Sequence, residues 1–286
     1  MPEGDSGAEA AYQGVLRIRE QLRIPVTIQR SIGSAGLAET LRSLAASDAT
    51  MIVAYGPEAG LALEKIDSDF PNQRFALVQG QSNAARVATY SVAHEQSAWL
   101  AGAAAGLLSR KKIVGHVGNL RNETTAAARG AFYSGLQTAL PKARFLSSFV
   151  VPGEVANRAK AQIAAGADVI FHTLDDDDTA LAAVARQHGV PLIGRGRDWL
   201  AQNPGVYAAT AIADTGVASF QAGQDLHDGL WKPGRHRKIG VENPKAVRLR
   251  LAEKTPEAVQ QRVDLYQREL KAGGYSVVTK YDGPEF

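Results

Sequence analysis

Four consecutive aspartates, Asp175–Asp178, follow a buried-strand pattern that ends at His172. At the start of the helix expected from Asp178 to His188, acidic side chains would cap unpaired N–H groups and suit the positive helix end. A second interpretation is contact with an amine-bearing ligand. A calcium or magnesium site is the least favoured, because the alternating ligand spacing and loop glycine of a hand-type site are missing. We expect no metal and no cofactor.

A second charged group, Gly194–Asp198 (GRGRD), stands at the end of an expected strand. Arg195 could hold a carboxylate or phosphate through two parallel hydrogen bonds, or an arginine could bridge to Asp198 across the turn. His172 is equally consistent with a core histidine and with a ligand contact. No serine, histidine and acid stand out as a nucleophilic triad, and a G-x-S-x-G motif is absent. We therefore expect a binding protein and no enzyme.

Other candidates lie in turns beside expected helices and strands. Gly4–Gly7 precedes a helix and offers backbone N–H groups and a carboxylate to a ligand, or simply caps the helix. Tyr55 ends a strand, where its ring could stack on a planar ligand or pack in the core. The tryptophans Trp99, Trp199 and Trp231 are expected to be packing residues rather than a ligand cage. Trp199 is the exception to test, because it adjoins the Arg195–Asp198 turn. The complete set of candidate ligand-binding residues is Asp5, Ser6, Tyr55, Gly56, Gln79, Asn119, His172, Asp175, Arg195, Asp198 and Thr210.

The element around which the chain is organised is His94–Asn119, which predicts a helix, a two-lysine break, a strand and a turn. Gly102 and Gly106, one helical turn apart, would let this helix lie close to a sheet. Helix and strand patterns alternate along the chain. Strands are expected at 25–29, 50–54, 74–78, 87–92, 113–117, 145–151, 168–172, 190–193, 205–210, 238–241 and 247–251.

This alternation predicts parallel sheets with helices on both faces, and 286 residues favour two lobes. We expect an N-terminal lobe of residues 1–92 plus about 211–233, and a C-terminal lobe of 93–210 plus about 234–286. No strand pattern precedes the first helix, expected at Glu9–Arg23. Gly4–Gly7 looks like the loop that normally follows a lobe's first strand, with that strand removed.

Composition narrows the function classes. The chain is 45% hydrophobic, carries a net charge of +3 and has no cysteine, which removes disulfides and thiolate sites. The basic cluster Lys232–Lys238 lacks interleaved aromatics, so we expect no nucleic acid partner. No leader or membrane-spanning pattern is present. The location is expected to be periplasmic or at the cell surface if a leader has been removed, and cytoplasmic if Met1 is native.

Several segments together resemble the basic membrane protein (BMP) family of substrate-binding proteins, which includes purine-nucleoside receptors of ABC importers. A helix with an LAG core precedes a strand similar to KIGFVGG, and a GF-x-x-G helix, a GADVI strand and an IG-x-D-x-D turn follow in the family's order. The matching segments are Ala88–Gly106, Lys111–Asn119, Ala128–Val150, Ala165–Thr173 and His188–Asp198. The resemblance implies a type I periplasmic-binding-protein-like fold, with two doubly wound parallel-sheet lobes joined by a hinge where the ligand is held.

The chain also departs from the pattern of purine-nucleoside receptors. Its start, Gly4–Ala8, lacks their Phe and Asn, and Gln79 replaces an Asp that ends one of their strands. Asp198 keeps the second acidic place of the IG-x-D-x-D turn. Gly196 replaces the first acid of that turn, Leu174–Asp178 replaces a glycine-rich turn, and a family lysine is missing near Ala213. Nucleoside specificity therefore does not carry over with the fold.

We predict a monomeric solute-binding protein, of the lipoprotein type in this family, that captures a small polar ligand, purine-like or other, for an ABC importer permease. The first alternative is a cytosolic ligand-sensing regulator with the same fold. The second is a nucleoside hydrolase acting through Asp175–Asp178.

Overall fold

A computed structural model of the chain describes residues 6–29, 36–119, 121–151, 153–174 and 179–286. The chain divides into two compact units, each with its own sheet: unit 1 comprises Met1–Val92 and Asp214–Ile239, and unit 2 comprises Ala93–Ala213 and Gly240–Phe286. The chain passes from unit 1 to unit 2 for the last time after Ile239, whereas we expected this boundary near residue 233. The reason is that strand β9 (His236–Ile239) pairs with β3 (Val87–Val92) of unit 1.

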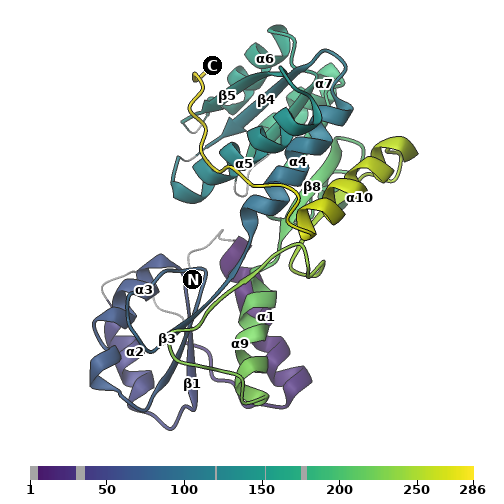
Figure 1. Cartoon of the computed structure of the whole chain (residues 1–286). Helices are drawn as coiled ribbons and strands as arrows, with labels where there is room; N and C mark the ends of the chain where they lie inside the picture. The colour runs from purple at the N-terminus through teal and green to yellow at the C-terminus, as the bar shows by residue number, and fades with distance from the viewer. Residues whose placement is uncertain (1–5, 30–35, 120, 152, 175–178) are drawn as a thin grey trace. The chain divides into compact units, whose positions relative to one another are not determined.

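Unit 1 is built on a parallel sheet in the order β1-β2-β3-β9, with β1 at Met51–Tyr55 and β2 at Arg74–Val78. Helices α2 (Leu37–Ala45) and α3 (Pro57–Glu64) cover one face, and a short 3-10 helix spans Asp67–Asp69. Helix α9 (Thr215–His227) covers the other face, and α1 (Ser6–Leu22) packs beside α9 (Figure 1).

Unit 2 contains a six-stranded sheet in the order β10-β8-β7-β6-β4-β5, in which only β10 is antiparallel to its neighbour. Two buried clusters fill the two faces of this sheet, one beneath α6 to α8 and one beneath α4 and α5. The strands are β4 Ile113–Gly118, β5 Arg144–Phe149, β6 Val169–Thr173, β7 Leu192–Arg195, β8 Tyr207–Ala213 and β10 Val247–Leu251. The helices are α4 His94–Leu108, α5 Glu123–Ala139, α6 Val155–Ala164, α7 Thr179–His188, α8 Trp199–Gln202 and α10 Glu257–Lys271.

The glycines of helix α4 were expected to allow a close approach to a sheet. In the structure, they allow a close approach to helix α5. A Cβ atom added at Gly102 would lie 1.9 Å from the carbonyl oxygen of Phe132, and one added at Gly135 would lie 1.9 Å from that of Trp99. Glycine is therefore required on both helices where they cross.

The chain after α10 runs in extended form over α5 towards β5 (Figure 1). A Cβ at Gly130 would lie 2.0 Å from the carbonyl oxygen of Thr279, and the Phe286 N–H donates to the Ser147 carbonyl at 2.7 Å. The β5 edge of the unit 2 sheet is thus covered by the end of the chain, which is a common protection for edge strands.

Ten of the eleven predicted strands are present, with ends that differ by a few residues. The strand predicted at Pro25–Gln29 is wrong, because these residues are described without regular secondary structure and pair with no strand. Within the described residues, no helix has the length and apolar character needed to cross a membrane.

Candidate functional site

Three of the predicted residues lie together at the carboxyl edge of the unit 1 sheet. Tyr55 ends β1, and the N–H of Gly56 donates to Val78 of neighbouring β2 at 2.9 Å. Gln79 follows β2 with a left-handed φ of 55°, and its N–H donates to Tyr90 of β3 at 3.0 Å. Such a conformation is uncommon outside glycine and is frequent at ligand-contacting positions. Open α/β sheets bind ligands at this edge.

The amino end of α1 lies at the same edge of unit 1. Helices α1 and α9 run in the same direction, since Gly14 meets Gly216 and Ile18 meets Gly223, and the Thr215 hydroxyl donates to the Gly7 carbonyl. Because α9 leads into β9, which is parallel to β3, both helices begin at the carboxyl edge of the sheet. Ser6 is the first residue of α1, whereas Asp5 lies outside the described residues.

In unit 2, Asn119 directly follows β4, where the preceding Gly118 pairs with Thr173 of β6. The side-chain Oδ1 of Asn119 is buried and has no hydrogen-bond partner among the described residues. A carboxamide oxygen in this state costs about 1–3 kcal/mol unless another group satisfies it. Asn119 is therefore suited to accept a hydrogen bond from a ligand N–H or O–H group.

His172 is fully buried in β6, and the structure favours the core interpretation for it. Its Nε2 lies 2.9 Å from the Tyr207 hydroxyl, and its ring packs edge-on against Trp199. Burial, with smaller contributions from Arg195 and Arg197, lowers the pKa of His172 to about 3. The ring is thus neutral at physiological pH and held inside the unit.

The charged turn after β7 is organised by a residue that the sequence prediction did not include. Asp198 forms an ion pair with Arg250 of β10. The sequence had suggested an arginine of the turn itself as the partner of Asp198. The other oxygen, Oδ1, is buried without a partner among the described residues. Arg195 ends β7, and its carbonyl oxygen accepts the Trp199 Nε1–H at 2.9 Å.

Thr210 lies inside β8 and is completely buried, whereas the predicted strand would have ended there. It is paired with Gly194 on β7 and with Arg250 on β10. Its hydroxyl has no partner in the described part of the chain. Asp175, the remaining predicted residue, belongs to the run 175–178, which lies outside the described residues.

Sequence reasoning also missed His116, a second buried histidine. Its two ring nitrogens lie 3.0 Å from the Ser147 hydroxyl and 3.1 Å from the Thr173 hydroxyl. Burial, then the charge of Arg129, lowers its pKa to about 3. The available signal was a polar residue inside an apolar strand pattern. Trp99 and Trp199 are buried packing residues, as expected.

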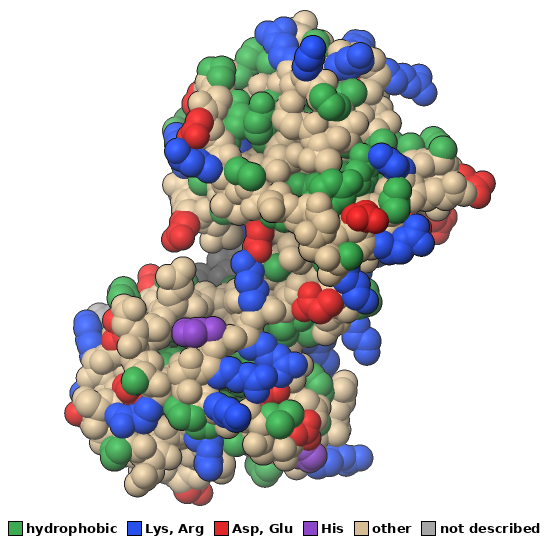
Figure 2. Space-filling model, in the orientation of Figure 1, with side chains coloured by type: hydrophobic (Ala, Val, Ile, Leu, Met, Phe, Trp, Pro, Cys, Tyr) green, Lys and Arg blue, Asp and Glu red, His purple; other side chains and the backbone are tan. Residues whose placement is uncertain are grey.

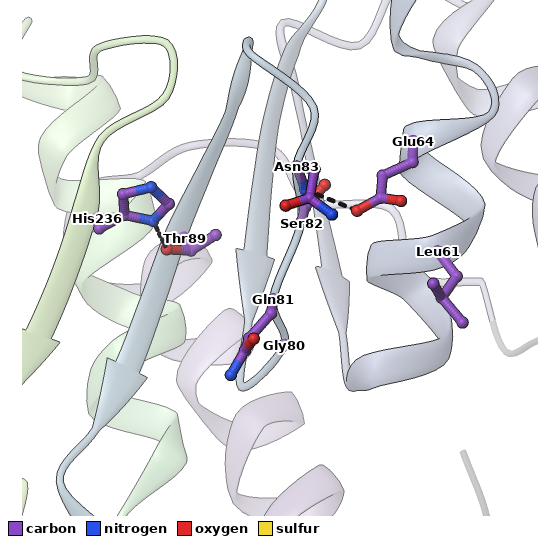
Figure 3. A pocket seen from close by; sticks show the side chains of 8 residues that line it. All are labelled: Leu61, Glu64, Gly80, Gln81, Ser82, Asn83, Thr89 and His236. Atoms are coloured by element: carbon purple, nitrogen blue, oxygen red, sulfur yellow. Dashed lines mark hydrogen bonds between the residues drawn. The ribbon is translucent and has the colours of Figure 1, made fainter.

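A groove of about 510 Å³ lies on unit 1, and its lining includes Gly80, which directly follows the predicted residue Gln79 (Figure 3). It is lined by α3, the chain after β2, and strands β3 and β9, with the Thr89 hydroxyl 2.7 Å from His236 Nδ1 and the Asn83 N–H 2.6 Å from Glu64. It shares no residue with the predicted set and lies beside the middle of β3. We do not assign the ligand to it.

The basic cluster Lys232–Lys238 has an internal partner. Arg237 donates to the buried carboxylate of Asp225 at 2.6 Å, and Arg235 lies 3.7 Å from it. On the visible face, acidic and basic side chains lie near one another on parts of both units, while Lys and Arg side chains gather at the upper end of the upper unit (Figure 2). The expected lack of a nucleic acid partner stays a prediction.

Comparison with protein families gives one match over most of the chain. The family described as ABC transporter substrate-binding protein PnrA-like matches residues 3–276. A purine-binding protein from Brucella abortus is 26% identical over 172 residues, covering 59% of this chain and 49% of that protein. The chain spans about half the length of the curated relatives it matches.

Solved structures with the same fold include both transport and regulatory proteins. A transcriptional activator of the comK gene from Bacillus halodurans has a TM-score of 0.80 at 14% identity, covering 93% of this chain and 94% of that one. An ABC transporter solute-binding protein from Aeropyrum pernix has a TM-score of 0.77 at 16% identity, covering 98% and 91%. These likenesses establish the type I periplasmic-binding-protein-like fold.

Proposed function

The chain belongs to the Bmp family of PnrA-like ABC transporter substrate-binding proteins, and from this premise we propose that it binds a purine base or nucleoside. The observation that carries the proposal is the buried, unpartnered carboxamide oxygen of Asn119 at the carboxyl edge of β4. Carboxamides recognise purines well, because one side chain offers both a donor and an acceptor to the edge of the base.

Two further residues support a planar, polar ligand. Tyr55 at the end of β1 presents an aromatic side chain suited to stacking on a purine ring. Gln79 follows the adjacent strand and brings a second carboxamide to the same edge of unit 1. The purine-binding relative from Brucella abortus favours the same ligand class.

We propose that the partner of the loaded protein is the permease of an ABC importer, and that the protein works outside the cytoplasm as a monomer. The likeness to the comK activator favours a second candidate, a ligand-sensing regulator with the same fold. Binding to permease-containing vesicles distinguishes the two, because only a transport protein should bind them. We also propose that bound nucleoside leaves unchanged, without hydrolysis.

The direct test is calorimetric titration and thermal unfolding with adenosine, guanosine, inosine and hypoxanthine, with ribose and free amino acids as controls. A purine at 100 times its Kd should stabilise the protein by about 2.7 kcal/mol, which is roughly a 5–10 °C rise in Tm. Chromatography of the recovered ligand should show intact nucleoside. No response to any purine would overturn the proposal, as would a response to ribose alone.

A further inference from the structure

Residues 275–286, which we call the covering segment, are anchored along the surface of unit 2 although they form no helix or strand (Figure 1). The ring of Tyr275 lies 4.8 Å from that of Trp99 on α4. Further along, the ring of Tyr281 packs edge-on against that of Tyr133 on α5, with 5.1 Å between their centres. These aromatic contacts fix the path of the segment, so the charged residues near its end have defined positions.

Glu285 of the covering segment pairs with two arginines that differ in burial. Its carboxylate forms an ion pair with Arg129 of α5, whose side chain is 3% exposed, and lies 3.5 Å from Arg121, whose side chain is 63% exposed. The Arg129 guanidinium also lies 4.8 Å from the ring centres of both Phe149 and Tyr281. A buried guanidinium left without a carboxylate is strongly destabilising. Among the described residues, Glu285 supplies that carboxylate.

A series of polar contacts leads from Arg129 to the end of β4. Arg129 donates to the Ser147 hydroxyl at 3.4 Å, and that hydroxyl lies 3.0 Å from Nδ1 of His116. The Nε2 of His116 lies 3.1 Å from the hydroxyl of Thr173. Thr173 pairs with Gly118, where an added Cβ would lie 2.5 Å from the Thr173 hydroxyl oxygen. The contacts therefore end tightly against the last residue of β4.

Asn119 lies between the two sets of contacts that start at Glu285. Gly118 directly precedes it, and Arg121 follows two residues later, just before the helix cap Asn122. The buried Oδ1 of Asn119 has no hydrogen-bond partner among the described residues. The direction of this oxygen therefore depends on the backbone on either side of it. A group that binds a ligand well must be held to within about 0.5 Å.

We propose that Glu285 is a positioning residue for Asn119. It holds the backbone after Asn119 through Arg121, and the backbone before it through Arg129 and the contacts that reach Gly118. The proposal rests on the function proposed above, because it takes Asn119 as a ligand-binding residue. Glu285 does not itself contact the ligand. It increases affinity because a group that is already ordered loses less conformational freedom on binding.

A double-mutant cycle tests whether Glu285 acts through Asn119. Glu285→Gln keeps the size of the side chain and removes its charge, and it should raise the Kd of the best purine about 2- to 30-fold. In a chain that already carries Asn119→Ala, the same change should leave the Kd unaltered. The proposal is overturned if Glu285→Gln raises the Kd equally in both chains, or in neither.

The matched control for the cycle is Asp282→Asn, which also removes one negative charge from the covering segment. Asp282 pairs with Lys280 of the same segment at 3.1 Å, and both side chains are exposed. This variant should bind purines as the parent does. A loss of affinity equal to that of Glu285→Gln would show that the charge of the segment matters and its contact with Arg129 does not, which overturns the proposal.

A second measurement needs no ligand. The NMR order parameter of the Asn119 backbone N–H should fall from about 0.85 towards 0.6 in Glu285→Gln, while those of Ile170 and Ile193 in the sheet stay the same. Arg121→Gln should cause a smaller fall without affecting folding, because exposed ion pairs add little stability. Unchanged values at Asn119, or an equal fall in the sheet, would overturn the proposal. If the parent binds no purine, the proposed function fails, and the order parameters still decide whether Glu285 positions Asn119.

Discussion

Asn119, Asp198 and Thr210 each bury a side-chain oxygen that has no hydrogen-bond partner among the described residues. Buried polar atoms in folded proteins are nearly always paired, so each exception needs a reason. A binding protein offers one, since its ligand can supply the missing donors. Of the three, Asn119 has the most favourable position, directly after a strand at the carboxyl edge of its sheet.

We expect Asn119→Ala to weaken binding of the best purine about 5- to 150-fold, corresponding to the loss of about 1–3 kcal/mol from one hydrogen-bonded carboxamide. Thermal stability without ligand should stay the same or rise slightly, because the substitution removes an unsatisfied oxygen. Isothermal titration measures the affinity. The matched control is Asn157→Ala at an exposed position of α6, which should bind as the parent does. Equal affinity of both variants would remove Asn119 from the site.

The two buried histidines predict a loss of stability in acid. Burial lowers the pKa of both His116 and His172 to about 3, whereas the unfolded chain titrates near the usual value of 6.5. The contribution to stability is complete above pH 6.5 and is lost as the pH falls towards 3, because the unfolded chain then binds protons that the folded chain excludes. The slope is up to about 1.4 kcal/mol per pH unit for each histidine.

Urea unfolding at several pH values between 7 and 4 measures this slope. His172→Gln keeps a hydrogen-bonding group for Tyr207 and cannot titrate, so its stability should fall less steeply with acid, by up to about 1.4 kcal/mol per pH unit. Parallel pH profiles for the parent and His172→Gln would contradict the assignment.

For individual residues, the sequence could indicate which ones are candidates for the site, but it could not predict which residues they contact in the fold. Asn119 and Gln79 follow apolar strand patterns, which is local information. The partner of Asp198 depends on β10 lying antiparallel to β8 with Arg250 opposite Thr210, a register between residues far apart in the chain. His172 was ambiguous for the same reason, since Tyr207 and Trp199 come from other elements.

Among the elements, α4 and α5 depend most on a single residue type. Gly102→Ala would place a methyl group against the backbone of Phe132, and we expect it to destabilise unit 2 by about 1–3 kcal/mol or more. Gly106→Ala is the matched control, because its nearest contact would be the Cβ of Ala139 at 3.0 Å. Urea midpoints should fall much further for Gly102→Ala; equal losses would show that the helices can separate without cost.

Strands were predicted correctly where the local residue pattern is that of a strand and the fold also supplies a neighbouring strand. The runs at 74–78, 87–92 and 247–251 are strands with the predicted bounds. Pro25–Gln29 carries the same β-branched pattern, but a strand forms only when its backbone groups find a neighbouring strand. That requirement is not written in the local sequence. The same limitation explains why the glycines of α4 were correctly recognised as a close contact but assigned to the wrong partner.

For the whole molecule, two separate cores imply two separate stabilities. Among the described residues, unit 1 has four strands, β1 pairs with one neighbour only, and helix α1 packs mainly on α9. Unit 2 has six strands, helices on both faces, and the end of the chain laid along β5. Partial unfolding starts where fewer buried contacts hold the backbone. We therefore expect unit 1 to unfold at a lower urea concentration than unit 2.

The tryptophans allow the two units to be followed separately. Trp99 and Trp199 are buried in unit 2, while Trp231 belongs to unit 1. In a Trp231→Phe chain, fluorescence reports unit 2 alone, whereas far-ultraviolet circular dichroism reports both units. The dichroism should begin to change at lower urea than the fluorescence, and hydrogen exchange should be faster in 51–55 than in 169–173. A single coincident transition by both probes would mean that the units unfold together, and an earlier change in fluorescence would reverse the predicted order.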